Sequence, residues 1–432
     1  MITKDFKKSA IVVSLLCAFS LSICQQKTFA VETPEIKAQL DTIEKKVEKD
    51  ELGEDVYAQL ERIIAQDPKN YRAHLYLGNC YAKLGLPDGA VEEFRLATQY
   101  GPGEPKAFVE LIKGQIKLGQ VPSAMQLLDE AKKKFPKDPE VQFWVGNYLL
   151  SKNRWMEAEA TYTEALKKGK VIFGLPTSLA EIKLMKGNPE EARDLALKDL
   201  KVDYSYAAAN RVYGLALAST GKFEESIEPL RRAFVQQPFK EGLADNLAAC
   251  AVWAGKYKLA LEPSLITLGT SSSPESNNPR EKKRLYDVFR HLSKADVEAG
   301  IAETRKKIGK HPRPSYFFAL GDVLDGMGYY KLAMEQYSAG LAEDPTFGRG
   351  WFRMGLDLER YARNYDAALE CYQKAHAYRP DDDQIVYHLH SLSDKLARRP
   401  DNWAWHLRDL IKPAKKIDLA NPPSTASVEA TR

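Results

Sequence analysis

Histidines and clustered carboxylates are the residues of this 432-residue chain whose spacing could do metal chemistry. His388 and His390 stand two positions apart, which on a helix points them about 200° away from each other rather than at one ion. The run from Asp381 to Asp383 lacks the alternating ligands and the closing Glu of a calcium loop, and its place after Pro380 favours a helix N-terminus. Neither group predicts a metal site.

The sequence also lacks catalytic motifs, and its cysteines are not predicted to be reactive. The sequence has no nucleophile elbow, phosphate-binding loop, dinucleotide fingerprint, His-Glu-x-x-His or Cys-x-x-Cys motif. Cys80 and Cys250 are far apart along the chain and are predicted to be small buried core residues. We therefore expect no catalytic residue, no metal and no cofactor. An enzyme or an obligate enzyme subunit, with a site in the repeat loops or in residues 281–312, is the less favoured alternative.

The charge balance excludes one class of partner. Lys plus Arg number 63 and Asp plus Glu number 59, and 4 of these cations with 1 anion fall in the first 30 residues. The remaining body is close to neutral, so we expect no nucleic acid partner. With 44% hydrophobic residues the chain has enough apolar side chains for a large core.

The first 30 residues have the layout of a secretory signal peptide. Three lysines at positions 4, 7 and 8 precede an apolar run from Ala10 to Cys24, and a small residue, Ala30, comes just before Val31. The pattern predicts export, to the periplasm or cell envelope or into the medium. An alternative resembles a bacterial lipoprotein signal acylated at Cys24, although Ile23 departs from the small residue expected there. Membrane attachment is expected only in that case.

The sequence repeats with a period of 34 residues, and this repeat predicts the helices on which any site residues would lie. Six units begin near residues 71, 105, 139, 173, 207 and 241, and two more lie in 313–381. Two slots hold small residues, namely Gly78, Gly146, Gly214, Gly321 and Gly355 in the first and Ala90, Ala124, Ala158 and Ala333 in the second. Small residues let the two helices of a pair cross closely. Proline then ends the second helix, at Pro102, Pro136, Pro238, Pro345 and Pro380.

The pattern resembles the tetratricopeptide repeat, whose Leu-Gly, Tyr, Ala, aromatic, Ala and Pro slots are matched in eight units over most of residues 71–381. The resemblance implies an all-α fold, a right-handed superhelical α-solenoid of stacked antiparallel helix pairs. It also implies that the first helices of successive units line a groove for a partner peptide.

The repeat and the composition between units predict a domain layout. A signal peptide at 1–30 precedes an array at 31–268, which has a degenerate first unit at 33–68 and six units at 71–268. A Ser- and Asn-rich linker is expected at 269–280. A degenerate helical pair at 281–312, two units at 313–381, capping helices at 382–412 and a disordered tail at 413–432 complete the chain.

The resemblance assigns the candidate binding residues slot by slot to the groove. They are cationic, amide and aromatic, namely Arg72, Asn79, Lys83, Lys106, Lys113, Lys117, Phe143, Asn147, Arg349, Phe352 and Arg360. The cations, with few opposing anions, favour an acidic partner segment or a terminal carboxylate, and a solvated helix face is the alternative. The aromatics, Phe318 included, either are exposed anchors or pack against the helix of the neighbouring unit. We expect a non-catalytic scaffold that binds a protein or peptide. A lipid-anchored assembly factor for an envelope machine is the alternative, and oligomeric state is open.

Overall fold

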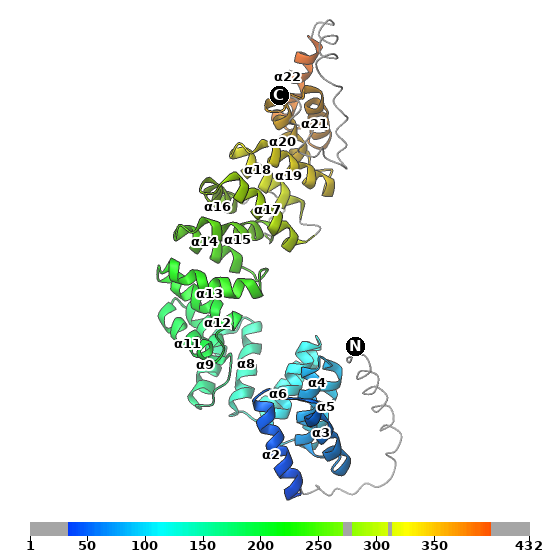
Figure 1. Ribbon diagram of the computed structural model, residues 1–432, viewed down its shortest axis with the longest axis vertical. Helices are drawn as coiled ribbons and strands as arrows, with labels where there is room; N and C mark the ends of the chain where they lie inside the picture. The colour runs from blue at the N-terminus through cyan, green and yellow to red at the C-terminus, as the bar shows by residue number, and fades with distance from the viewer. Residues whose placement is uncertain (1–32, 271–278, 310–312, 399–432) are drawn as a thin grey trace. The chain divides into compact units, whose positions relative to one another are not determined.

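The structure, a computed structural model, describes residues 33–270, 279–309 and 313–398. Every regular element in these ranges is an α-helix, and none is a strand (Figure 1). The predicted signal peptide with Cys24, the helix expected after Asp401 and the predicted tail lie outside the described residues. Within the described ranges, no helix has the length and apolar composition that crossing a bilayer requires.

The chain divides into two compact units between Ile172 and Phe173. Unit 1 contains eight described helices: α2 (Pro34–Glu48), α3 (Glu54–Gln66), α4 (Tyr71–Lys83), α5 (Pro87–Tyr100), α6 (Pro105–Lys117), α7 (Val121–Lys134), α8 (Pro139–Ser151) and α9 (Trp155–Lys167). Consecutive helices pack on one another from α3 to α9. A hydrophobic core runs from Ile36 in α2 to Leu111 in α6.

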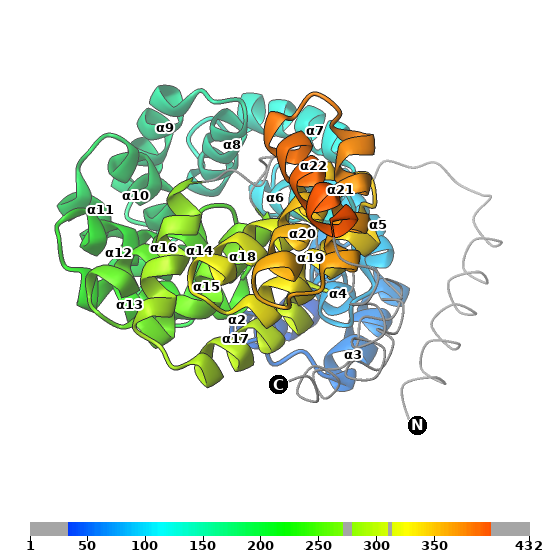
Figure 2. The ribbon, with the colours of Figure 1, turned by 90° about the horizontal axis from the view of Figure 1, so that it is seen from above.

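Unit 2 contains the remaining described helices and has its own core, which runs from Ile227 to Leu392. They are α10 (Leu175–Met185), α11 (Pro189–Val202), α12 (Ala207–Ser219), α13 (Phe223–Gln236), α14 (Leu243–Trp253), α15 (Tyr257–Thr270), α16 (Pro279–Arg290), α17 (Lys294–Ile308), α18 (Pro314–Gly326), α19 (Tyr330–Glu343), α20 (Gly348–Arg360), α21 (Tyr365–Tyr378) and α22 (Asp383–Ala397). Seen from above, α14, α15, α16 and α18 lie close together (Figure 2).

The small-residue slots act as the sequence predicts. A Cβ on Gly78 would lie 2.5 Å from a ring carbon of Phe94, and one on Gly321 would lie 2.5 Å from a ring carbon of Tyr337. In both hairpins the glycine belongs to the first helix and the ring to the second. The aromatic ring therefore fills the space that the missing side chain leaves, and the hairpin closes tightly.

Helix ends also follow the sequence signals. The helices α5, α7, α13, α19 and α21 each end two residues before a proline of the repeat. Thr33 and Asp382 are N-caps of α2 and α22, and their side chains accept backbone N–H groups of Ile36 at 3.3 Å and Gln384 at 3.2 Å. The acidic run before α22 is thus a cap, as predicted.

The predicted linker at 269–280 is helical at both ends, since α15 continues to Thr270 and α16 begins at Pro279. The core of unit 2 includes residues on both sides of this segment, such as Leu265 and Leu285. Residues 271–278 lie outside the described ranges. The other predicted domain boundaries stay predictions.

Candidate functional site

The cations predicted in the first helices of unit 1 already have carboxylate partners. The guanidinium of Arg72 in α4 lies 2.7 Å from Asp41 Oδ1 and 3.0 Å from Glu44 Oε2, both in α2. Lys106 in α6 lies 3.9 Å from Glu44 Oε1. The expectation that few anions oppose these cations is therefore wrong, because the degenerate first unit supplies two of them.

The other lysines of this face differ in how far they are neutralised. Lys83 lies 3.0 Å from Asp50 Oδ1 and also donates to the backbone carbonyl of that residue. Lys113 pairs with Glu110 of its own helix at 2.7 Å. Lys117 is exposed and makes no ion pair with a described residue. Only this last lysine is left as an unneutralised cation in unit 1's predicted set.

The two predicted amides are not equivalent. Asn147 in α8 accepts a hydrogen bond from the hydroxyl of Tyr162 in α9 at 2.6 Å, so its oxygen is used within the hairpin. Asn79 in α4 is half-buried and makes no hydrogen bond to a described residue through its side chain. Asn79 is therefore the amide that keeps both its donor and its acceptor for a ligand.

Two of the three predicted aromatics are buried, as the packing alternative predicts, and are not exposed anchors. Phe318 is 2% exposed and Phe352 is 7% exposed, because each packs against a neighbouring hairpin. The ring of Phe352 contacts those of Tyr372 and His388, with centroids 5.8 Å and 5.5 Å away. Phe143 is half-buried beside Trp144. These rings stabilise the stack, and Phe143 alone is left partly open.

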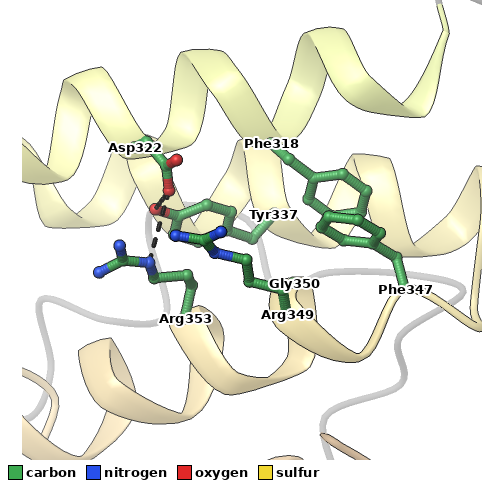
Figure 3. Close-up of a pocket in the computed structure, with 7 residues that line it drawn as sticks. All are labelled: Phe318, Asp322, Tyr337, Phe347, Arg349, Gly350 and Arg353. Atoms are coloured by element: carbon green, nitrogen blue, oxygen red, sulfur yellow. Dashed lines mark hydrogen bonds and ion pairs between the residues drawn. The ribbon is translucent and has the colours of Figure 1, made fainter. Parts of the chain in front are cut away.

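A narrow pocket, too small to hold a water molecule, lies where α18, α19 and α20 meet (Figure 3). Its lining residues are Phe318, Asp322, Tyr337, Phe347, Arg349, Gly350 and Arg353. The ring of Phe347 stacks on that of Phe318 at 4.2 Å, and a Cβ on Gly350 would come 2.5 Å from the ring of Phe318. The close approach of α20 to this ring thus depends on a glycine.

One carboxylate organises the polar side of the pocket. Asp322 Oδ1 accepts from the Tyr337 hydroxyl at 3.1 Å and lies 3.6 Å from Arg353 Nε, as Figure 3 shows. Its Oδ2 accepts from Lys282 Nζ at 2.6 Å. Arg349, by contrast, is exposed and makes no ion pair with a described residue. Arg349 is therefore an exposed guanidinium at the edge of this pocket with no described carboxylate partner.

Three arginines share one side of α20. Arg349, Arg353 and Arg360 stand at positions i, i+4 and i+11, which a helical period of about 3.6 residues places on the same face. Arg360 is exposed and, like Arg349, makes no ion pair with a described residue. We call these three residues the α20 arginine row.

A buried carboxyl beside the row keeps its proton. Asp357 is 2% exposed, and its Oδ2 has no hydrogen-bond partner among the described residues. Burial, followed by the negative charge of Asp325 in α18, raises the pKa of Asp357 to about 8, while the charges of Arg353 and Arg360 oppose the shift. At neutral pH this residue is mostly uncharged and does not cancel the arginine row.

The sequence missed Asp322, Arg353 and Asp357 as site residues. The first two carry a usable signal, since Asp322 follows the repeat glycine Gly321 directly and Arg353 stands one turn after Arg349. No sequence feature distinguishes Asp357, because its importance comes from burial.

Other chemistry-bearing groups are not assembled into a site. The three cysteines in the described ranges are free and buried, and burial raises the pKa of Cys80 to about 11 and that of Cys371 to about 12. Within those ranges no three His, Cys, Asp or Glu side chains are grouped as metal ligands could be. The thiols are structural, as predicted for Cys80 and Cys250.

Family models of the tetratricopeptide repeat match three segments of the chain. One model matches residues 58–105 and 178–240, and a second matches residues 85–143. The matched segments include helices of both units. No curated protein matches the sequence significantly.

Several solved structures are similar to the chain at low identity. PilF of Pseudomonas aeruginosa is 16% identical with a TM-score of 0.38, over 55% of this chain and 99% of that protein. PilW, a type IV pilus biogenesis factor, is 14% identical with a TM-score of 0.37, over 51% and 98%. Human IFIT1 is 15% identical with a TM-score of 0.40, over 75% and 78%. Similarity at this level gives no information about function.

Proposed function

Because this chain belongs to the tetratricopeptide repeat family, we propose that it is a non-catalytic scaffold that binds a segment of a partner protein. Proteins of this family are in general protein-interaction scaffolds, and two cores of packed helices contain most of the buried apolar residues of the described ranges. The partner segment is acidic and binds at the α20 arginine row.

The observation that carries this proposal is the unneutralised charge of the row. Arg349 and Arg360 have no carboxylate partner among the described residues, whereas Arg72, Lys83, Lys106 and Lys113 all have one. A free guanidinium binds a carboxylate through two parallel hydrogen bonds. The row therefore offers more to an acidic segment than the lysine-rich face of unit 1 does.

A charge-reversal experiment tests the proposal. The probe is a short fluorescein-labelled peptide of alternating Glu and Phe, and its affinity is measured by fluorescence anisotropy. Replacing Arg349→Glu together with Arg360→Glu is expected to weaken binding about a hundredfold, since each lost charge-assisted contact costs about 1.4 kcal/mol or more. Raised salt should weaken the wild-type complex, because the interacting charges are exposed.

Two matched controls make the result specific. Lys113→Glu with Lys117→Glu changes charge on the unit 1 face, and Arg62→Glu changes an exposed arginine on α3, a second helix. Both are expected to alter affinity by less than about threefold. Equal losses in the row variant and in either control would contradict the assignment to α20.

We also propose that the protein acts in an exported compartment, in view of the basic, apolar and small-residue order of residues 1–30. Mass spectrometry of the mature protein from its native host tests this. A chain that begins at Val31 supports export with cleavage, and one that begins at an acylated Cys24 supports the lipid-anchored alternative. A chain that retains residues 1–30 contradicts both.

A further inference from the structure

The helix α17 leaves the stacking order that the rest of unit 2 follows. In the other hairpins the second helix packs against its own first helix and against the next first helix, as α19 does with α18 and α20. The main packing partner of α17 is instead α15, and α15 also reaches α18. The position that a regular second helix would take beside α18 is thus partly filled by α15.

Three contacts hold α17 against α15. A Cβ on Gly300 would meet the side chain of Leu261, so a small residue is needed at this crossing. Lys258 of α15 lies 3.0 Å from Asp296 of α17, and Lys307 of α17 lies 2.7 Å from Glu262 of α15. Residues of both helices therefore stabilise the position of α17 against α15.

An open cleft lies between α17 and the next second helix, α19. Its volume is about 590 Å³, and it is lined by Glu298, Ile301, Ala302, Arg305, Lys306, Gly309, Leu332, Glu335 and Gln336. The α17 members stand at spacings of three and four residues, which places them in one stripe, and Leu332, Glu335 and Gln336 form a matching stripe on α19. The cleft is thus a groove between two helix faces.

Charge is divided along this groove. Glu335 is half-buried and makes no ion pair with a described residue; burial and the nearby charge of Glu298 raise its pKa. Glu298 already pairs with Lys294 of its own helix at 3.8 Å. Arg305 and Lys306, about two turns further along α17 than Glu298, make no ion pair with a described residue. At one end of the groove Glu335 is therefore the carboxylate left for a cation, and the other end suits an anion.

A buried amide adds a hydrogen-bonding group to the apolar floor. Gln336 is 5% exposed, and its Oε1 has no partner among the described residues. An unpaired buried amide costs free energy until a donor reaches it. The backbone or side-chain N–H of a bound segment would provide that donor.

We propose that the α17–α19 cleft is a second binding site of this protein, and that it takes a partner peptide with a Lys or Arg beside an aliphatic residue. The basic side chain lies beside Glu335, and the aliphatic one covers Ile301 and Leu332. This site is on second helices, away from the α20 arginine row, and its charge preference is opposite. Its existence does not depend on the proposed function of that row.

Peptide selection on the full-length protein tests the site. Random peptides displayed on phage are selected against the Arg349→Glu/Arg360→Glu variant, which removes the first site. The enriched sequences are expected to share a Lys or Arg next to Leu, Ile or Val. A synthetic peptide of that consensus should then bind the wild-type protein. Glu335→Gln should weaken this binding about tenfold, because it removes the ion pair between Glu335 and the basic side chain of the peptide.

Two further variants separate binding in the cleft from loss of folding. Ala302→Trp places a large ring on an exposed position of the groove and should also weaken binding about tenfold. Glu225→Gln removes an exposed carboxylate from α13 and should leave the affinity within about twofold. Circular dichroism melts of all three variants should match the wild type.

Four outcomes would overturn the proposal. Selection could yield no consensus, or it could yield a consensus peptide whose affinity is unchanged by both Glu335→Gln and Ala302→Trp. Binding that appears only after the chain is shortened at residue 398 would make the protein's own C-terminal segment the occupant. Concentration-dependent dimers that Glu335→Gln abolishes would make a second copy the occupant.

Discussion

The first-helix face of unit 1 and the α20 arginine row in unit 2 contain the same kinds of side chain in different electrostatic surroundings. Around α4 and α6 the cations meet Asp41, Glu44, Asp50 and Glu110. Along α20 only Arg353 has a carboxylate partner, Asp322 at 3.6 Å. Arg349 and Arg360 make no ion pair with a described residue, and burial raises the pKa of the neighbouring Asp357. A cation in a repeat slot is therefore a ligand-binding group only where the facing slot of the neighbouring helix carries no charged carboxylate.

The hairpins of both units depend on a glycine that packs against an aromatic ring, and substitutions of this glycine are expected to have the largest effect on stability. Gly321→Ala would bring a Cβ within 2.5 Å of Tyr337, and Gly78→Ala would do the same to Phe94. Each is expected to lower the free energy of unfolding by about 3 kcal/mol through overpacking. Urea denaturation measures this. Gly326→Ala is the control, because a Cβ there has ordinary contacts and should be neutral or stabilising; equal losses at all three sites would contradict the shared slot.

Asp357→Asn tests why the row stays positive. The pKa of Asp357 is raised above its ordinary value of 3.8 to about 8, so the folded state holds the proton more tightly than the unfolded state. Its contribution to stability is full below about pH 4 and is lost as pH rises towards 8 and beyond. The variant should therefore gain stability relative to wild type between pH 5 and pH 9.

Unfolding in urea at the two pH values measures that gain, and the acidic probe gives a second reading. Affinity for the probe should fall in wild type as pH rises through 8, when Asp357 becomes charged beside Arg353 and Arg360. Asp325, Tyr337 and Tyr361 are the other titratable groups near it. A variant that keeps the wild-type pH profile would show that another group is responsible.

Arg72→Met compares the stabilising value of a paired arginine with that of a free one. Loss of the contacts to Asp41 and Glu44 is expected to cost about 1 kcal/mol, since Arg72 is only 13% exposed. Arg349→Met should change the free energy of unfolding by less than about 0.5 kcal/mol. Thermal melts at low and high salt measure both, and a larger loss at Arg349 would mean that the row is structural.

Removing the carboxylates of the first-helix face of unit 1 should make that face bind the acidic probe, as the α20 arginine row is proposed to do. Asp41→Asn with Glu44→Gln removes two carboxylates that pair with Arg72 and Lys106, and the acidic probe is expected to bind unit 1 about threefold more tightly. Anisotropy in the Arg349→Glu/Arg360→Glu background isolates that gain. If removal of these carboxylates left probe binding unchanged, neutralisation could not explain the difference between the regions.

Much of the fold could be predicted because small residues and prolines act locally. Gly321 and its partner Tyr337 belong to one hairpin, and each proline ends the helix just before it. The displacement of α17 could not be predicted in this way. It depends on Gly300 meeting Leu261 and on ion pairs between residues about 40 positions apart, which no repeat slot encodes.

The site was harder to predict because its charges are decided by neighbours. Arg72 and Arg349 are both arginines in first helices, and only the spatial partner distinguishes them. The degenerate first unit supplies Asp41 and Glu44 without matching the repeat pattern. Phe352, a candidate exposed anchor, is buried because His388 and Tyr372 cover it.

Two buried tyrosines of second helices reach the first helix of their hairpin with their hydroxyl groups. The hydroxyl of Tyr162 donates to Asn147, and that of Tyr337 donates to Asp322. A ligand that competes for either acceptor would release a buried phenol from its hydrogen bond. The near-ultraviolet absorbance of these rings would then report occupancy in the unlabelled protein.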